Sequence, residues 1–244
     1  MTNSFPNLNF NRRRRGPLPI VIGILVVASI ALVSLSGFYA DWLWFKSVDF
    51  TEVWSTILLT KATVFVIAGL ATSLVITLNV YIAFRKRPLY VPLTSEADNL
   101  ERYRSQIEPI RRLVLVGLAL VLFYFGGSSA SQLWDTWLLF RNATPFGVTD
   151  PQFGLDISFF AFKLPMYQAL VGWAISTLVF AIIGSAIVHY LYGGIRPQVA
   201  QERTTVAARV QLSVLLGLVV LLKAVAYWLD RYALALKENR LITG

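Results

Sequence analysis

Between Lys163 and Arg196 the sequence reads LPMYQALVGWAISTLVFAIIGSAIVHYLYGGI (residues 164–195), which is 32 residues without a charged side chain, interrupted only by neutral His189. A helix needs about 20 consecutive apolar residues to cross the hydrocarbon core of a bilayer. This stretch is therefore long enough to span a membrane. It predicts a transmembrane helix at about residues 166–191.

Four further stretches are apolar over a similar length, so the chain is predicted to be an all-α integral membrane bundle of about five transmembrane helices. The first stretch follows Arg12–Arg15, as the core of a signal peptide would. It is longer than the roughly 7–15 residues of such a core and lacks a small-x-small cleavage site, so we expect an uncleaved anchor. The four helices are predicted at about residues 17–39, 56–84, 112–133 and 207–229.

The overall composition favours a chain immersed in lipid. Of its 244 residues, 56% are apolar and 14% are charged, whereas soluble domains carry about 25% charged residues because they need a wet surface. The chain has no cysteine and one histidine, so it cannot by itself supply a disulfide, a thiolate zinc site or a multi-histidine metal site. No Walker motif, nucleophile elbow or pair of intramembrane carboxylates occurs. We therefore expect no catalytic or metal-binding residue and no cofactor.

The placement of lysine and arginine predicts the orientation. With the N-terminus in the cytoplasm, the cytoplasmic segments hold 14 basic residues and the outer segments hold 6. This asymmetry satisfies the positive-inside rule. The N-terminus is thus predicted to be cytoplasmic and the C-terminus extracytoplasmic, and the net charge of +9 belongs to loops that face lipid headgroups rather than nucleic acid.

These predictions divide the chain into a basic cytoplasmic tail (1–16), a membrane domain (17–229) and an extracytoplasmic tail (230–244). The membrane domain includes a cytoplasmic loop at 85–111 and an outer aromatic loop at 134–165. The expected partners are the bilayer and its anionic cytoplasmic headgroups, while a protein partner or a homo-oligomer is left open. The basic residues predicted to face those headgroups are Arg12, Arg13, Arg14, Arg15, Arg85, Lys86 and Arg87.

The two long loops each contain a predicted helix start. In the cytoplasmic loop, Ser95 stands three residues before Asp98, which predicts a helix start. A thin apolar stripe of Leu100, Tyr103 and Ile107 follows at helical spacing and favours a short helix on the membrane surface over a partner-binding site. In the outer loop, Asp150 followed by Pro151 predicts an N-cap with proline in the first helical position. Pro165 is expected to begin the fourth span.

The outer loop resembles the signature of uncharacterised protein family 0182, whose members are large multi-pass bacterial membrane proteins, prominent in actinobacteria. Two further segments, DWLWF (41–45) and LDRY (229–232), resemble the family in the same order along the chain. The residues that carry the signature include Asp150, Pro151, Gln152, Phe153, Gly154, Asp156, Phe159 and Pro165.

The resemblance implies a plasma-membrane protein whose first helices precede a large extracytoplasmic domain and further helices. It implies no biochemical activity and no catalytic positions. Because this chain stops at Gly244, we expect it to be an N-terminal fragment or a truncated product of such a protein.

A few polar residues lie inside the predicted spans. Lys61 and Lys223 are charges in apolar surroundings, which favours either snorkelling towards the headgroups or a path for an ion or substrate. Asn79 is expected to bond a neighbouring helix. His189 is expected at the membrane interface, with a proton relay as the alternative. The stretch Gly126–Ser131 is expected to let helices approach closely, or else to unwind into a binding element.

The leading functional hypothesis is a membrane-embedded scaffold that anchors an extracytoplasmic domain. The alternative is a component of a transporter or channel in which Lys61, Lys223 and the Gly126–Ser131 stretch line the path. An intramembrane enzyme is a third and weaker hypothesis, because no catalytic motif is present.

Overall fold

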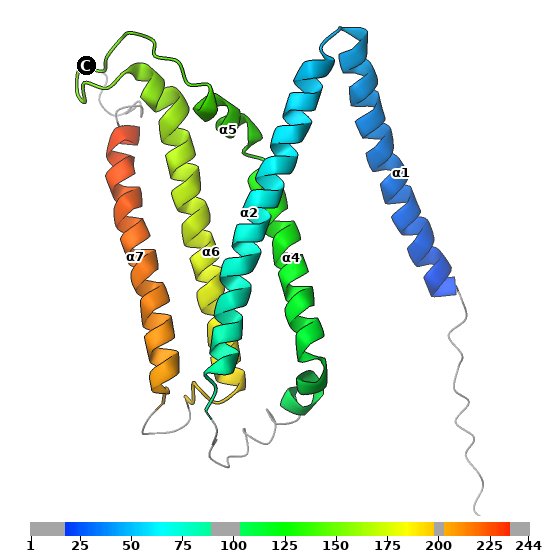
Figure 1. Ribbon diagram of the computed structural model, residues 1–244, viewed down its shortest axis with the longest axis vertical. Helices are drawn as coiled ribbons and strands as arrows, with labels where there is room; N and C mark the ends of the chain where they lie inside the picture. Colours follow the sequence, from blue (N-terminus) through cyan, green and yellow to red (C-terminus); the bar gives the residue numbers. More distant parts are fainter. Residues whose placement is uncertain (1–17, 89–102, 198–202, 235–244) are drawn as a thin grey trace, which may run out of the picture. The chain divides into compact units, whose positions relative to one another are not determined.

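The computed structural model describes residues 18–88, 103–197 and 203–234, and nearly all of their ordered structure is helical (Figure 1). Over those ranges there is no β-strand, and two isolated bridges join Thr149 to Asp156 and Ile195 to Thr204. The all-α prediction is confirmed. The elements are α1 (Leu18–Ser47), α2 (Thr51–Arg85), the short 3₁₀ helix η1 (Glu108–Ile110), α4 (Arg111–Ser131), α5 (Trp134–Arg141), the π-helical η2 (Phe159–Lys163), α6 (Leu164–Leu191) and α7 (Val206–Leu234).

Four helical segments in the described ranges are long and apolar enough to cross a membrane: 51–85, 103–131, 159–191 and 206–234. They leave large apolar side chains such as Leu59, Leu74 and Leu113 about 70% exposed, as expected of helices whose outer faces contact lipid rather than water. The helix α1 overlaps the first predicted span, 17–39, but is not among these four. The count of five spans and the orientation of the termini stay predictions.

Most helices extend beyond their predicted ends. The first was predicted to end at 39 and continues to Ser47, the second begins at Thr51 instead of 56, and α7 continues past 229 to Leu234. Counting apolar residues measures only the lipid-immersed length, and polar or aromatic residues continue a helix beyond it. The predicted helix start at Ser95–Asp98 and the tail Arg12–Arg15 lie outside the described residues.

The chain divides into two compact units, residues 1–56 and 57–244, and each is described by itself. In the first, a tight turn joins the end of α1 to the start of α2. Asp49 has a φ of 59° at this turn, a left-handed conformation that aspartate tolerates better than most residues. The amide of Phe50 donates to the carbonyl oxygen of Phe45 at 2.9 Å, and the rings of Phe38 and Trp54 pack edge to face with centroids 5.0 Å apart.

In the second unit, α2 packs against α4 through glycine. A Cβ on Gly69 would stand 2.6 Å from the carbonyl oxygen of Phe123, and one on Gly127 would stand 2.6 Å from that of Phe65. The two backbones approach this closely because neither glycine has a side chain. Ser73 adds an interhelical hydrogen bond from its hydroxyl to the carbonyl oxygen of Ala119 at 2.8 Å. The Gly126–Ser131 stretch is helical throughout, so it packs helices together and does not unwind.

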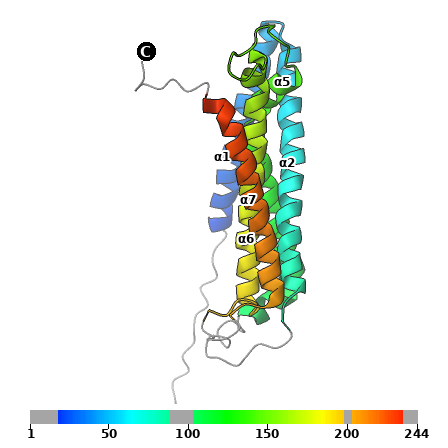
Figure 2. The ribbon, with the colours of Figure 1, turned by 90° about the vertical axis from the view of Figure 1, so that its left-hand side faces the viewer.

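Helices α6 and α7 lie side by side along their length, as the two views of the ribbon show (Figures 1 and 2). Midway along them, Ala181 and Leu215 pack against Ile76 of α2. Near the end that carries α5, Phe160 and Leu164 pack against Leu229 and Tyr232. We call this end of the second unit the α5 end.

The predicted outer loop contains more helix than expected. Trp134–Arg141, expected to be loop, forms α5. Asp150–Pro151 does not begin a helix: residues 151–153 form only a turn, since Gly154 at a φ of 65° reverses the chain. The helix begins instead directly after Asp156.

Pro165 does not begin the fourth span either, because that helix already runs from Ile157 through the π-helical turn into α6. Proline lacks the amide hydrogen for a helical bond, and its ring collides with the carbonyl four residues earlier. That carbonyl belongs to Ala161, inside the π-helical turn. A π-helical turn widens the backbone locally and is a known site of helix distortion, so it accommodates the proline without ending the helix.

Candidate functional site

The two most deeply buried polar side chains among the described residues, Ser185 and His189, meet two partly buried ones where three apolar helices come together. Asn79 of α2, Ser185 and His189 of α6, and Gln211 of α7 form what we call the buried polar cluster. Ser185 is 0% exposed and His189 is 1% exposed. The Gln211 amide nitrogen donates to the backbone oxygen of Asn79 at 2.9 Å, and lies 3.3 Å from both the Asn79 side-chain oxygen and the Ser185 hydroxyl. One glutamine thus ties α7 to α2 and α6.

The bonding around Gln211 defines the tautomer of His189. Because the Gln211 amide nitrogen faces acceptors, its oxygen is the atom that faces His189, at 3.0 Å from Nε2. In a neutral imidazole, Nε2 must then carry the hydrogen and donate it, and Nδ1 is a bare acceptor. Nδ1 is buried beside Gly194 and has no hydrogen-bond partner among the residues that the structure describes. An amide neither gains nor loses a proton at neutral pH, so this bonding favours a structural clamp over a proton relay.

The side chain of His189 is buried between helices in the last turn of α6, and its place at the membrane interface stays a prediction. Asn79 makes the interhelical bond that its position in an apolar helix predicts. The sequence reasoning missed Ser185 and Gln211. Gln211 carries a readable signal, because an uncharged polar side chain inside an apolar span usually faces another helix.

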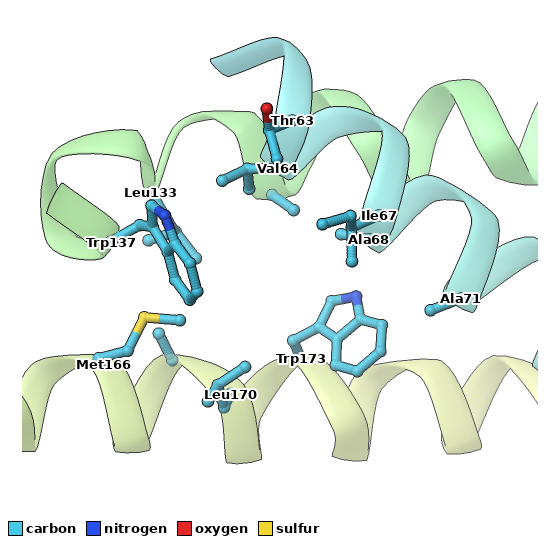
Figure 3. A pocket seen from close by; sticks show the side chains of 12 residues that line it. Thr63, Val64, Ile67, Ala68, Ala71, Leu133, Trp137, Met166, Leu170 and Trp173 are labelled. Atoms are coloured by element: carbon cyan, nitrogen blue, oxygen red, sulfur yellow. The ribbon is translucent and has the colours of Figure 1, made fainter. Parts of the chain in front are cut away.

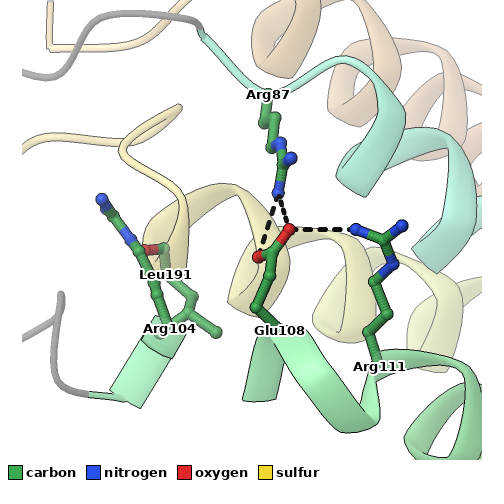
Figure 4. Close-up of polar contacts among 5 residues, drawn as sticks. All are labelled: Arg87, Arg104, Glu108, Arg111 and Leu191. Atoms are coloured by element: carbon green, nitrogen blue, oxygen red, sulfur yellow. Dashed lines mark hydrogen bonds and ion pairs between the residues drawn. The ribbon is translucent and has the colours of Figure 1, made fainter. Parts of the chain in front are cut away.

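An arginine–aromatic cluster lies where α2 ends and α4 begins, at the opposite end of the second unit from α5 (Figure 1). Figure 4 shows its polar contacts. Glu108 accepts from the guanidinium of Arg87 at 3.2 Å and from that of Arg111 at 3.0 Å. The Nε of Arg104 donates to the carbonyl oxygen of Leu191 at 2.6 Å, where the last turn of α6 has an orphan acceptor. The guanidinium of Arg87 also stacks at 4.5 Å from the centroid of the Phe84 ring.

This second cluster changes the interpretation of the basic residues. Arg87, predicted to face lipid headgroups, is paired within the chain, while Arg85 and Lys86 are exposed. Tyr192 sits among the three arginines, with Arg87 5.3 Å and Arg104 5.7 Å from its ring centroid. Burial, assisted by the charge of Glu108, raises the pKa of the Tyr192 phenol above its usual value, so it stays a neutral aromatic platform.

The two lysines within the spans lie apart, each against its own aromatic ring. The Nζ of Lys61 stands 5.3 Å from the ring centroid of Trp134, and that of Lys223 stands 5.1 Å from Tyr227. Lys223 also lines a groove of about 260 Å³ between α6 and α7 with Gln168 and Asp230. Ala130 of the Gly126–Ser131 stretch lines an apolar cavity with Thr63 and Val64 of α2, near Lys61, whereas Lys223 lies in the separate groove between α6 and α7. The structure therefore does not bring all three elements of the hypothetical path together.

The signature segment of the outer loop is built around two carboxylates. Asp150 accepts from the amides of Gln152 and Phe153 at 3.0 and 2.7 Å. Asp156 accepts from the amides of Phe146, Gly147 and Ser158 at 2.8–3.1 Å. Hydrogen bonds from Ser158, then from Phe146 and Gly147, lower the pKa of Asp156 from 3.8 to about 2. In the described ranges no group of three or more histidine, cysteine, aspartate or glutamate residues is placed to hold a metal ion.

Asp156→Asn is expected to release the loop at 146–158, because an amide offers one acceptor oxygen where the carboxylate offers two. The pKa of the Asp156 carboxyl is lower in the folded chain than in the unfolded chain. The stabilisation of the loop by this carboxylate is therefore present above pH 4 and is lost as the pH falls from about 4 to 2. Hydrogen exchange at the Phe146, Gly147 and Ser158 amides, corrected for intrinsic rates, should accelerate over that range. In the variant it should already be fast at pH 6.

The matched control is Asp135→Asn, whose carboxylate caps only Thr136 and should leave those three amides protected. Equal protection in Asp156→Asn and the unaltered chain at pH 6 would contradict the assigned role.

Comparison with known proteins points to one family. The model of the Uncharacterised protein family (UPF0182) matches residues 18–244. Similar proteins include a UPF0182 protein of Streptomyces coelicolor, 44% identical over 93% of this chain and 23% of the relative, and one of Nocardioides sp., 44% identical over 98% of this chain and 24% of the relative. A third, of Thermobifida fusca, is 45% identical over 93% of this chain and 22% of the relative.

The chain thus spans about a quarter of the length of these relatives. No solved structure matches it. The match covers the four membrane-compatible helices, the buried polar cluster and the outer-loop signature, and so the chain belongs to the Uncharacterised protein family (UPF0182).

Proposed function

We propose that this chain forms a membrane-embedded scaffold in the bacterial plasma membrane. The observation that carries the proposal is the buried polar cluster, in which Gln211 bonds to three partners on two other helices. Hydrogen bonds between helices in lipid specify which faces meet. Together with the glycine contacts between α2 and α4, they give a base of fixed geometry, which is what a scaffold requires.

In family members about four times longer, this base would anchor and orient an extracytoplasmic portion of the protein. Two observations support this role. The relatives are much longer than this chain, and the two carboxylates of the outer loop accept several backbone hydrogen bonds that hold the loop in shape. The transport alternative has weaker support, because Lys223 lies in the groove between α6 and α7 and not in the cavity that Ala130 of the Gly126–Ser131 stretch lines.

The scaffold requires a defined orientation, which reporter fusions test. An alkaline phosphatase fused after Gly244 is expected to be active in the periplasm, and the same enzyme fused after Pro92 is expected to be silent. The physical reason is the excess of basic residues in the segments assigned to the cytoplasm. A cytoplasmic reporter, green fluorescent protein, should give the reverse pattern at the two positions.

Two outcomes would contradict the proposal. An active phosphatase after Pro92 would overturn the orientation. Ion flux through proteoliposomes containing the chain, reduced by Lys61→Leu or Lys223→Leu with both variants fully inserted, would establish the transport alternative instead.

A further inference from the structure

An apolar cavity opens between α2, α4, α5 and α6 near the α5 end (Figure 3). Its volume is about 180 Å³. An engineered apolar cavity of about 150 Å³ stays dry and takes up a hydrocarbon, so this space suits an aliphatic chain better than water. Apolar side chains line it, among them Val64, Ala68, Leu133, Trp137, Met166 and Trp173.

The ring of Trp173 lines the cavity, and its one polar atom has a hydrogen-bond partner outside the cavity. The indole nitrogen of Trp173 donates to the hydroxyl of Thr72 at 3.1 Å, which holds the ring in place and leaves carbon atoms facing the cavity. Figure 3 shows Trp173 and Trp137 at two sides of the space, with Met166 and Leu170 along the wall formed by α6.

Lys61 is not itself among the lining residues of this cavity but precedes two of them, Thr63 and Val64, along α2. It is on the same face of α2 as Val64 and Ala68, which follow it by three and seven residues. Its Nζ lies over Trp134, and the lining residues Leu133 and Trp137 come immediately before Trp134 and one turn after it. The lining of the cavity therefore begins within one turn of the lysine on α2 and beside the tryptophan that the lysine contacts.

The depth of Lys61 matches a lipid headgroup. Residues 62–84 form a run of 23 uncharged residues between Lys61 and Arg85, about 34 Å of helix against a hydrocarbon core of about 30 Å. The two charges thus bracket the core, with Lys61 at the headgroup level of the α5 end and Trp134 beside it as an interfacial aromatic. The cavity begins at Thr63, just inside the hydrocarbon.

The charge of Lys61 has no anionic partner among the described side chains. No described carboxylate forms an ion pair with it. The acid closest to Trp134 along the chain is Asp135, and its carboxylate accepts from the amide and hydroxyl of Thr136. A lysine at headgroup depth above an apolar cavity is complementary to an anionic head on an aliphatic tail.

We propose that this site binds one phospholipid of the leaflet at the α5 end, with an acyl chain in the cavity and its phosphate on Lys61. The site is independent of the larger domain that the scaffold carries. It would fill the gap between α2, α4, α5 and α6 with a structural lipid.

Native mass spectrometry of the intact, detergent-solubilised chain tests the proposal. The probes are phosphatidylglycerol and diacylglycerol with identical acyl chains, titrated to measure the first binding step. Phosphatidylglycerol should bind about fivefold more tightly than diacylglycerol, the factor that one lysine near a lipid surface contributes. Lys61→Gln should remove that preference, and Ala68→Leu, which fills the cavity, should abolish the first step for both lipids.

Two variants serve as matched controls. Ala62→Leu adds the same side chain on an exposed position of α2, outside the cavity, and Lys223→Gln removes the other span lysine. Both should bind like the unaltered chain, and near-ultraviolet circular dichroism should show that all four variants keep their aromatic packing.

Three results would overturn the proposal. The first is the absence of a first-lipid step in the unaltered chain, which would mean that a protein segment closes the cavity. The second is full lipid binding by a correctly folded Ala68→Leu variant. The third is an unchanged preference for phosphatidylglycerol in Lys61→Gln, which would place the headgroup elsewhere.

Discussion

Replacing Gly127 with alanine is expected to lower the unfolding free energy of the chain by about 1–3 kcal/mol, the usual cost of overpacking a well-packed contact. The added Cβ would stand 2.6 Å from the carbonyl oxygen of Phe65 and 2.9 Å from its ring. The ring can rotate, but the carbonyl is part of α2 and cannot move without displacing the helix. The loss is expected even though alanine favours a helix by about 1 kcal/mol over glycine.

The measurement is a denaturation curve of the detergent-solubilised chain in sodium dodecyl sulfate, followed by far-ultraviolet circular dichroism. Gly117→Ala is the matched control, because it lies on the same helix and a Cβ there would meet no atom within 4 Å. That variant should be neutral or slightly stabilised. A similar loss at both positions would mean that α4 resists alanine for reasons unrelated to its contact with α2.

Replacing Gln211 with leucine is expected to cost roughly 2 kcal/mol of unfolding free energy, within the range for leaving buried polar groups without partners. A single interhelical hydrogen bond in a membrane protein contributes about 0.6 kcal/mol on average. Gln211 takes part in four polar contacts, and its loss strands the Nε2 hydrogen of His189 in a fully buried position.

A double-mutant cycle separates this clamp from a general loss of packing. The double variant His189→Leu with Gln211→Leu should lose less unfolding free energy than the two single variants lose in sum. Each single variant leaves the other residue's polar group buried without a partner, and in the double variant both groups are absent. Ser176→Ala is the control: its exposed hydroxyl bonds only within α6, to Gly172, and its removal should have little effect. Strict additivity between His189 and Gln211 would contradict the assigned hydrogen bond.

Sequence reasoning located the polar side chains better than their surroundings. Lys61, Asn79 and His189 stand out in apolar spans, yet their neighbours are decided by helices more than twenty residues away in the sequence. Trp134 covers Lys61 because the segment expected to be loop is the helix α5. The amide of Thr205 donates to the carbonyl oxygen of Gly194, so α7 starts beside the end of α6. His189 is buried there because Gln211 of α7 contacts its ring.

The outer loop illustrates a different difficulty, since two similar capping signals compete there. Asp150–Pro151 matches a helix start in the sequence, and Asp156 has no proline after it. Gly154 turns the chain between them, and the amides of Phe146 and Gly147 converge on Asp156 from ten and nine residues earlier. Local propensity cannot register these longer-range donors, so the predicted start was six residues too early.

The sequence by itself determined that the chain is helical and where the apolar helices lie. In lipid the backbone must satisfy its hydrogen bonds within each segment, so a long apolar run permits little else. Only the tertiary structure decided which faces of these helices meet. A helix that is apolar on all sides has no stripe that marks its protein-facing side. The pairing therefore rests on a few positions, Gly127 against Phe65 and Gln211 against Asn79 and His189, whose significance appears only when the helices are side by side.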